Sequence, residues 1–249
     1  MEDKFTVYSE NLAGTESVAI LDRQEKIINI DNLDYEKKYS DAAYEDYINN
    51  FEQSTNKRVV FRVVKRFFDI FLSLIAIIVL SPLFLILAIA IKVDSKGPVL
   101  FKQARIGKNG KIFTCYKFRS MSNEAPHNCP TCEFHDDGGY ITKVGKFIRK
   151  FSIDELPQLW CCFIGTMSIV GYRPLIIEES ECNAMREKLG VFSMRPGITG
   201  YAQVIGRDAV YYKNKAILDA EYVKRASILF DIKIVFKTIG VVLSRKGAK

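Results

Sequence analysis

An apolar run from Ile70 to Ile91 constrains this chain more than any other feature of its sequence. A helix rises 1.5 Å per residue, so about 20 apolar residues cross the hydrocarbon core of a bilayer, and the run has that length. It begins too far from the N-terminus, and is too long, for the apolar core of a signal peptide. The run therefore predicts a membrane segment.

Ser81 and Pro82 interrupt the run near its middle. Proline removes an amide donor and clashes with the preceding turn, so we expect a break there, with Ser81 bonding a freed carbonyl. Positive charge flanks both ends and marks the cytoplasmic side, so a re-entrant hairpin is favoured. A Pro-kinked spanning helix is the alternative, and Asp69 fits the membrane interface in either case. The flanking cations are Arg58, Arg62, Lys65 and Arg66 before the run, and Lys92, Lys96, Lys102 and Arg105 after it.

Charge divides the chain into an acidic and a basic part. Residues 1–58 hold 7 Lys/Arg against 13 Asp/Glu, and residues 59–249 hold 29 against 16. We therefore expect an accessory extension at 1–58, a membrane hairpin at 59–96 and one globular domain at 97–249. The basic excess suits anionic lipids and phosphorylated substrates, whereas the sequence carries no base-reading motif, so no nucleic acid is expected as a partner.

The six cysteines do not form a secreted disulfide framework, because two are adjacent in an apolar stretch and others are isolated. This usage favours a reducing cytoplasm, with most cysteines as small core residues. One loop combines a Cys-x-x-Cys pair with both histidines of the chain, which indicates a Zn²⁺ site, although the spacing is tighter than in a usual zinc finger. A polar loop without metal is the alternative. The four candidate ligands are His127, Cys129, Cys132 and His135.

The remaining pattern predicts an α/β fold that is mostly helical. Two β-rich runs, 99–101 and 112–118, flank an Asn-Gly turn and predict a small hairpin. Helical spacing begins at Gly145, and Pro157 predicts a helix start near Asp154, with the acidic pair in its first turn. A last amphipathic stretch, 228–243, is expected in the membrane interface, and the extension holds either a strand pair or a short helix from about Ser40 to Phe51.

Asp154 and Glu155 are the candidate catalytic residues. A carboxylate at a helix N-terminus is stabilised as an anion and can act as nucleophile or metal ligand, while its neighbour orients it or acts as acid or base. Arginines fixed beside prolines and glycines suit phosphate oxygens. The candidate phosphate-binding residues lie in three motifs and are Lys117, Arg119, Arg173, Arg195, Gly197 and Thr199.

The order of these motifs resembles that of the bacterial monotopic phosphoglycosyl transferases, also called bacterial sugar transferases. The resemblance covers about residues 62–245 and implies a re-entrant membrane helix followed by a compact cytoplasmic catalytic domain. The matching motifs are Lys65-Arg66-Phe67-Phe68-Asp69, the Ser81-Pro82 break, Lys117-Phe118-Arg119-Ser120-Met121, Asp154-Glu155-Leu156-Pro157-Gln158-Leu159, Arg173-Pro174-Leu175, Arg195-Pro196-Gly197-Ile198-Thr199-Gly200-Tyr201-Ala202-Gln203-Val204 and Leu218-Asp219-x-x-Tyr222-Val223.

The resemblance implies transfer of a sugar 1-phosphate from a UDP-sugar to a polyprenyl phosphate, usually undecaprenyl phosphate, with release of UMP. Asp154 would form a phosphosugar-aspartyl intermediate, and Glu155 would assist. Mg²⁺, with Mn²⁺ as an alternative, would be held by Asp154 together with the substrate. The setting would be the bacterial inner membrane with the domain facing the cytoplasm, at the first membrane step of polysaccharide synthesis. A homodimer and contacts with downstream glycosyltransferases remain open.

The chain departs from the family pattern at three motifs. Gly165-Thr166-Met167-Ser168 stands where the family commonly has Gly-Asp-Met-Ser, and Tyr172 stands where it usually has proline. The Asn-Gly-Arg-Asn stretch survives only in part, as Ile205-Gly206-Arg207-Asp208. If the missing aspartate is a structural cap, Thr166 replaces it. Two other function classes remain: a membrane-anchored scaffold without catalysis, and a phosphohydrolase that uses water as acceptor.

Overall fold

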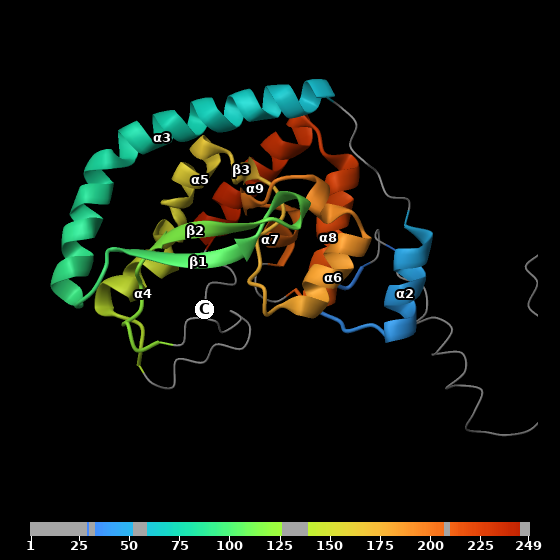
Figure 1. The fold of residues 1–249 in the computed structure, drawn as a ribbon, viewed down its shortest axis with the longest axis horizontal. Coiled ribbons are helices and arrows are strands. Elements are labelled where there is room, and N and C mark those ends of the chain that lie inside the picture. Colours follow the sequence, from blue (N-terminus) through green and yellow to red (C-terminus); the bar gives the residue numbers. More distant parts are fainter. Residues whose placement is uncertain (1–28, 30–32, 52–58, 126–138, 207–209, 245–249) are drawn as a thin grey trace, which may run out of the picture. The chain divides into compact units, whose positions relative to one another are not determined.

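The computed structural model describes residues 29, 33–51, 59–125, 139–206 and 210–244 (Figure 1). The four candidate zinc ligands, at 127, 129, 132 and 135, lie outside these residues. Most of the acidic extension does too. Its described part holds helix α2, Asp41–Asn50, in a small unit of its own, and the Ser40 side chain accepts a hydrogen bond from the amide of Ala43. The short helix expected from about Ser40 is therefore present.

Helix α3, Val59–Asp94, contains the whole apolar run. It is the one helix of the described residues that is long and apolar enough to cross a membrane, and only 11% of its most apolar window is buried. Figure 1 shows a sharp bend near its middle, and Pro82 lies inside the helix. Pro82 cannot donate to the carbonyl of Ile78, four residues earlier, and the Ser81 hydroxyl donates to that carbonyl instead, at 2.7 Å. The expected bend is present, but the helix does not break into two.

Both ends of α3 are attached to the same compact unit. Near the start, Lys65 Nζ forms an ion pair with Asp231 Oδ2 at 2.6 Å. Near the end, Asp94 Oδ2 accepts a hydrogen bond from the amide of Val144 at 2.9 Å. A straight helix of this length would separate its ends by roughly 50 Å. The bend therefore allows both ends to be held by one domain.

The sequence suggested that Asp69 lies in the membrane interface, and the structure shows that it does not. It is 3% exposed, and its carboxylate accepts hydrogen bonds from the Ser168 hydroxyl and the Ile169 amide. A buried carboxylate needs such donors, and here they come from strand β3, Ser168–Val170. Asp69 therefore attaches α3 to the domain core.

The strands form two small sheets. Strands β1, Leu100–Ile106, and β2, Ile112–Phe118, pair antiparallel with Leu100 opposite Phe118, which confirms the expected hairpin. Its turn includes Asn109 in the left-handed region, with φ 57°. Strands β3, Ser168–Val170, and β4, Gly197–Thr199, pair parallel.

Short helices surround the sheets and complete a mostly helical α/β unit. Leu87 and Ile91 of α3 pack with Phe118 and Ile148 in one core cluster, so α3 shares the domain's hydrophobic core. The helices are α4 Lys143–Lys150, α5 Gln158–Ile164, α6 Ser180–Lys188, α7 Tyr201–Gly206, α8 Tyr212–Arg225 and α9 Ile228–Ser244, with short 3-10 turns η2 Lys108–Gly110, η3 Ile153–Glu155 and η4 Val191–Ser193.

The acidic pair was expected in the first turn of an α-helix, but it lies before that helix. Asp154 and Glu155 form η3, and α5 begins only at Gln158, directly after Pro157. Ser152, just before η3, has φ 55° and ψ 23°, a left-handed conformation that few residues other than glycine adopt. This turn separates α4 from α5, so the helical spacing from Gly145 onward belongs to two helices. The four described cysteines, by contrast, are free and buried, as expected.

Candidate active site

Glu155 is the centre of a compact charged cluster. Its Oε1 accepts a hydrogen bond from Lys117 Nζ at 2.8 Å and from Arg173 at 3.0 Å, and its side chain is only 15% exposed. Burial alone would raise the pKa of Glu155, but the charges of Arg173 and Lys117 outweigh it and hold that pKa well below its usual range. Glu155 is therefore an anion at any physiological pH.

Asp154 has the opposite electrostatic character. Burial raises the pKa of its carboxyl to about 6, and the negative charge of Glu155 adds to the rise, while Lys117, Arg149 and Arg173 oppose it. Within the described residues, no group donates a hydrogen bond to the Asp154 carboxylate. A partly desolvated, unbonded carboxylate is a stronger nucleophile than one saturated with donors.

Three separate elements bring this cluster together. Lys117 lies near the end of β2, Arg173 follows β3, and the two carboxylates come from η3, which contacts both β2 and α4. All four of these residues were expected in the site from the sequence. The structure therefore brings together two of the three cationic motifs and the acidic pair.

Arg149 is a member of the cluster that the sequence analysis missed. It lies in the last turn of α4, and its charge lowers the pKa of Asp154. Its position five residues before Asp154 could have indicated this, because a short turn after a helix brings the chain back toward the last residues of that helix. With both carboxylates ionised, three cations face two anions, so the cluster has a net positive charge that suits a diphosphate substrate.

Arg119 was expected to bind phosphate, but the structure gives its guanidinium another role. The residue is 5% exposed, and it donates hydrogen bonds to the carbonyls of Ser95 and Lys96, just beyond the last turn of α3. Terminal carbonyls carry a partial negative charge, which a cation satisfies. Arg119 thus holds the end of the membrane helix.

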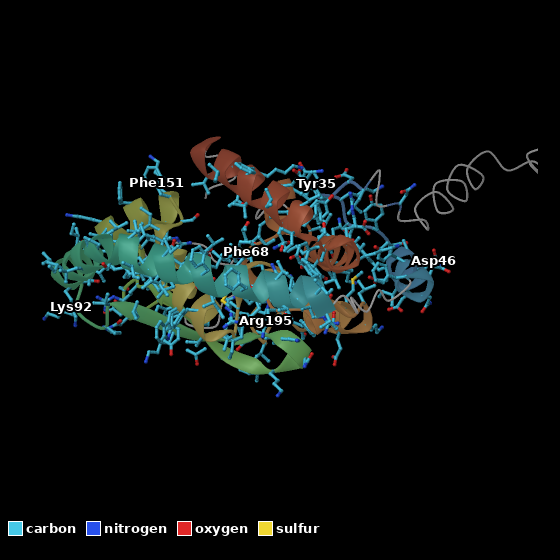
Figure 2. All side chains as sticks on the ribbon, turned by 90° about the horizontal axis from the view of Figure 1, so that it is seen from above. Tyr35, Asp46, Phe68, Lys92, Phe151 and Arg195 are labelled. Atoms are coloured by element: carbon cyan, nitrogen blue, oxygen red, sulfur yellow. The ribbon has the colours of Figure 1, made fainter. Side chains whose placement is uncertain are left out.

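Arg195 also lies apart from Glu155. Its Nε donates to the carbonyl of Gly165 at 2.7 Å, just after α5, where Arg66 donates to the carbonyls of Cys162 and Phe163. Figure 2 shows Arg195 beside α3. These two arginines therefore cap the C-terminal end of α5 from opposite parts of the chain, and within the described residues Arg195 forms no hydrogen bond with the acidic pair.

Gly197 and Thr199 contribute packing contacts between elements. A side chain at Gly197 would come within 2.1 Å of the backbone nitrogen of Gly171, so glycine permits β4 to approach that segment. Thr199 is 8% exposed and shares a 2.7 Å hydrogen bond with the Thr238 hydroxyl of α9. The glycine was expected to give access to phosphate, whereas the structure uses it for strand packing.

Two of the three departures from the family pattern have structural explanations, and the third lies partly outside the described residues, at 207–209. The Thr166 hydroxyl donates to the carbonyl of Cys161 in α5, a bond that an ionised aspartate cannot make. Tyr172 is fully buried, and its ring lies 5.4 Å from the guanidinium carbon of Arg186. Within the described residues, neither side chain forms a hydrogen bond with the acidic pair.

A divalent cation fits this site only together with substrate. The described residues contain no group of three or more metal-ligating side chains. Glu155 is occupied by two cationic side chains, which leaves the Asp154 carboxylate as the available protein ligand. Mg²⁺ commonly binds through one or two carboxylates and substrate phosphates, so this donor set suits it.

The comparisons with known proteins agree with these features. An uncharacterized sugar transferase of Haemophilus influenzae is 42% identical over 202 residues, which cover 75% of this chain and 42% of that protein. The undecaprenyl-phosphate galactose phosphotransferase of Salmonella typhimurium is 40% identical over 203 residues, with 75% and 42% covered. The exopolysaccharide production protein ExoY of Sinorhizobium fredii is 38% identical over 200 residues, with 75% and 88% covered.

The chain thus spans less than half the length of two of these relatives and most of the third. The model of the bacterial sugar transferase family matches residues 60–245, which include α3, the charged cluster and α9. This chain belongs to the bacterial sugar transferase family.

Proposed function

We propose that this protein transfers a sugar 1-phosphate from a UDP-sugar to undecaprenyl phosphate, with release of UMP. The observation that carries the proposal is the pairing of a desolvated Asp154 with a Glu155 already neutralised by Lys117 and Arg173. The name of the Salmonella relative, an undecaprenyl-phosphate galactose phosphotransferase, supports the acceptor and the reaction type. The product is a sugar linked by a diphosphate to the lipid.

In the first half-reaction, an Asp154 carboxylate oxygen attacks the phosphorus that carries the sugar. The bond between this phosphorus and the bridging diphosphate oxygen breaks, and its electron pair leaves with UMP. Arg149, Lys117 and Arg173 supply positive charge beside the carboxylates, which stabilises the charge that develops on the phosphate oxygens. Glu155 keeps two of these cations in place.

In the second half-reaction, an oxygen of the lipid phosphate attacks the same phosphorus. The phosphorus–Asp154 bond breaks, and the free carboxylate returns. The acceptor is a lipid, so the enzyme must work at a membrane surface, and α3 with its exposed apolar residues provides the anchor. We place the domain on the cytoplasmic face of the inner membrane, where UDP-sugars occur.

The proposed divalent cation, Mg²⁺ or Mn²⁺, would be held by Asp154 and the substrate phosphates, and it would neutralise diphosphate charge. The roles of the protein residues do not depend on how the cation is coordinated. They orient the phosphate, hold the carboxylate and exclude water from the intermediate.

Release of UMP tests the proposal. The protein, in detergent or nanodiscs, is given a panel of UDP-sugars with undecaprenyl phosphate and Mg²⁺. Asp154→Asn removes the nucleophile, and Glu178→Gln, at an exposed carboxylate on the same domain, is the matched control. We expect UMP and a lipid product from the wild type and from the Glu178 variant, and neither from the Asp154 variant.

Each rival function gives a different result. A phosphohydrolase would release free sugar phosphate without a lipid product. A scaffold would release no UMP with any donor, although the protein is folded. Wild-type turnover that survives Asp154→Asn would overturn the role of that carboxylate.

A further inference from the structure

Away from the acidic pair, the domain buries a complete ion pair. Arg186 of α6 and Asp219 of α8 lie 2.5 Å apart, and each side chain is only 1% exposed. Desolvating two charges costs several kcal/mol per ion, and apolar replacements for such pairs are often neutral or stabilising. Stability alone is thus a weak reason for a pair in this position.

Arg186 also contacts one short segment of the backbone, although its buried Nε has no hydrogen-bond partner within the described residues. Its NH1 donates to the backbone carbonyl of Arg173 at 2.9 Å, and its guanidinium lies over the ring of Tyr172, 5.4 Å from guanidinium carbon to ring centroid. Asp219 holds the opposite NH2 group of the same guanidinium. The buried ion pair therefore fixes the backbone at Tyr172 and Arg173.

A second arginine holds the next peptide from another element. Arg105 of β1 donates through NH1 to the carbonyl of Pro174 at 3.0 Å. The segment that includes Arg173 follows β3 and lies outside both strands of that sheet. Two guanidiniums thus bind the consecutive carbonyls of Arg173 and Pro174, beyond the regular pairing of β3 with β4. From this segment the Arg173 side chain reaches Glu155.

We propose that the Arg186–Asp219 pair is a positioning device for Arg173, so that both are positioning residues for the phosphate-handling cluster. This inference rests on the proposed function, in which Arg173 supplies positive charge beside Asp154. A guanidinium fixed by a carboxylate restricts the direction of a bound carbonyl more than apolar packing does, because its donors are planar and fixed. Loss of the pair therefore moves Arg173 without removing it.

A double-mutant cycle separates this role from a merely structural one. Arg186→Met together with Asp219→Leu removes both charges, so no buried charge is left unpaired, and the Met sulfur suits the Tyr172 ring. This pair variant is measured alone and in an Arg173→Gln background. Alone, we expect kcat/KM for UMP release to fall at least tenfold; in the Arg173→Gln background, we expect no further fall.

The matched control removes a second largely buried ion pair. Lys65→Met with Asp231→Leu deletes the pair between α3 and α9, whose side chains are 12% and 11% exposed. If this control lowers kcat/KM, combining it with Arg173→Gln should lower kcat/KM by the product of the two separate factors. If the Arg186–Asp219 variant also multiplies with it, or shows no loss alone, the positioning role is overturned.

Hydrogen exchange over residues 171–175 tests the same proposal without turnover. We expect faster exchange in the Arg186–Asp219 variant and unchanged exchange in the control variant. Should the pair variant fail to fold, Arg186→Lys keeps a cation beside Asp219 but lacks the guanidinium fork, and the same increase is expected. Unchanged exchange would overturn the inference, whereas an inactive wild type would overturn the proposed function and leave the exchange result decisive.

Discussion

Two adjacent carboxylates in this protein have opposite electrostatic environments. Burial raises the pKa of Asp154 to about 6, whereas Arg173 and Lys117 hold the pKa of Glu155 well below its usual range. Pairs of titratable groups whose environments separate their pKa values commonly divide catalytic roles. These environments support the proposed roles, with Asp154 as the nucleophile and Glu155 as the fixed counter-charge.

The pH dependence of kcat/KM follows from this assignment. Asp154 must be ionised to attack, so activity should fall about tenfold per pH unit below an apparent pKa near 6. Glu155→Gln removes a negative charge that raises the pKa of Asp154, so the acidic limb of its residual activity should move to lower pH. UMP release measured from pH 4.5 to 8 checks both. A rate that stays level between pH 5 and 7 would contradict the assignment.

Asp154 should also limit stability. The pKa of Asp154 in the folded protein is about 6, above its ordinary value of 3.8. Protonation of Asp154 therefore stabilises the folded protein fully below about pH 4, and this contribution is lost as the pH rises through 6. Asp154→Asn carries no charge and should stabilise the protein by up to about 3 kcal/mol at pH 7.5, and by little near pH 4. Thermal unfolding at both pH values is the measurement. An equal effect at both would argue against a desolvated carboxylate.

Individual arginines mark the limit of what the sequence could predict at this scale. Arg119, Arg173 and Arg195 all lie in similar motifs with proline, glycine or serine nearby, yet only Arg173 contacts Glu155. The other two bind carbonyls that follow helix ends, and those helix ends were not visible in a one-dimensional pattern. The acidic pair was identifiable because both carboxylates stand beside a proline that begins a helix.

At the scale of elements, α3 combines a membrane helix with a part of the domain core. Its middle exposes large apolar residues such as Ile78, Val79 and Leu85, whereas Leu87 and Ile91 pack against Phe118. The Ser81–Pro82 pair could be interpreted from sequence because its effect is local. The burial of Asp69 could not, because its partners lie about 100 residues away.

The topology of α3 gives a test. Both of its ends are held by one domain, so they should lie on the same side of the membrane as a re-entrant helix requires. Tags at the N- and C-termini should be digested together in inside-out vesicles and protected together in right-side-out vesicles. Protection of one tag and digestion of the other in the same vesicles would show a spanning helix.

At the scale of the whole molecule, three consecutive residues link the membrane helix to the charged cluster. Lys117 binds Glu155, Phe118 packs against Leu87 and Ile91, and Arg119 binds the carbonyls after α3. Lys117 and Phe118 lie on opposite faces of β2, as the alternation of a strand requires, and Arg119 lies just beyond the end of the strand. Ile153, next to the proposed nucleophile, packs on the same core cluster, so Asp154 lies close to this end of the apolar helix.

The β-hairpin of β1 and β2 and the long apolar helix were predictable, and the acidic pair could be proposed as a site, because each depends on neighbouring residues. The buried Arg186–Asp219 pair was not, since its two residues are 33 positions apart and charged residues are usually exposed. The sequence also could not show that Asp154 lies in a 3-10 turn, because Pro157 is compatible with a helix start at several nearby positions.

The covalent intermediate on Asp154 can be detected most directly by mixing enzyme and UDP-sugar without any lipid acceptor. We predict a burst of about one UMP per active site and an increase in intact mass equal to one sugar phosphate, located on the peptide that contains Asp154, because the first half-reaction needs no acceptor. Adding undecaprenyl phosphate should then remove the adduct. UMP that forms only when the lipid phosphate is present, with no adduct on the enzyme, would show direct displacement and contradict the proposed nucleophile.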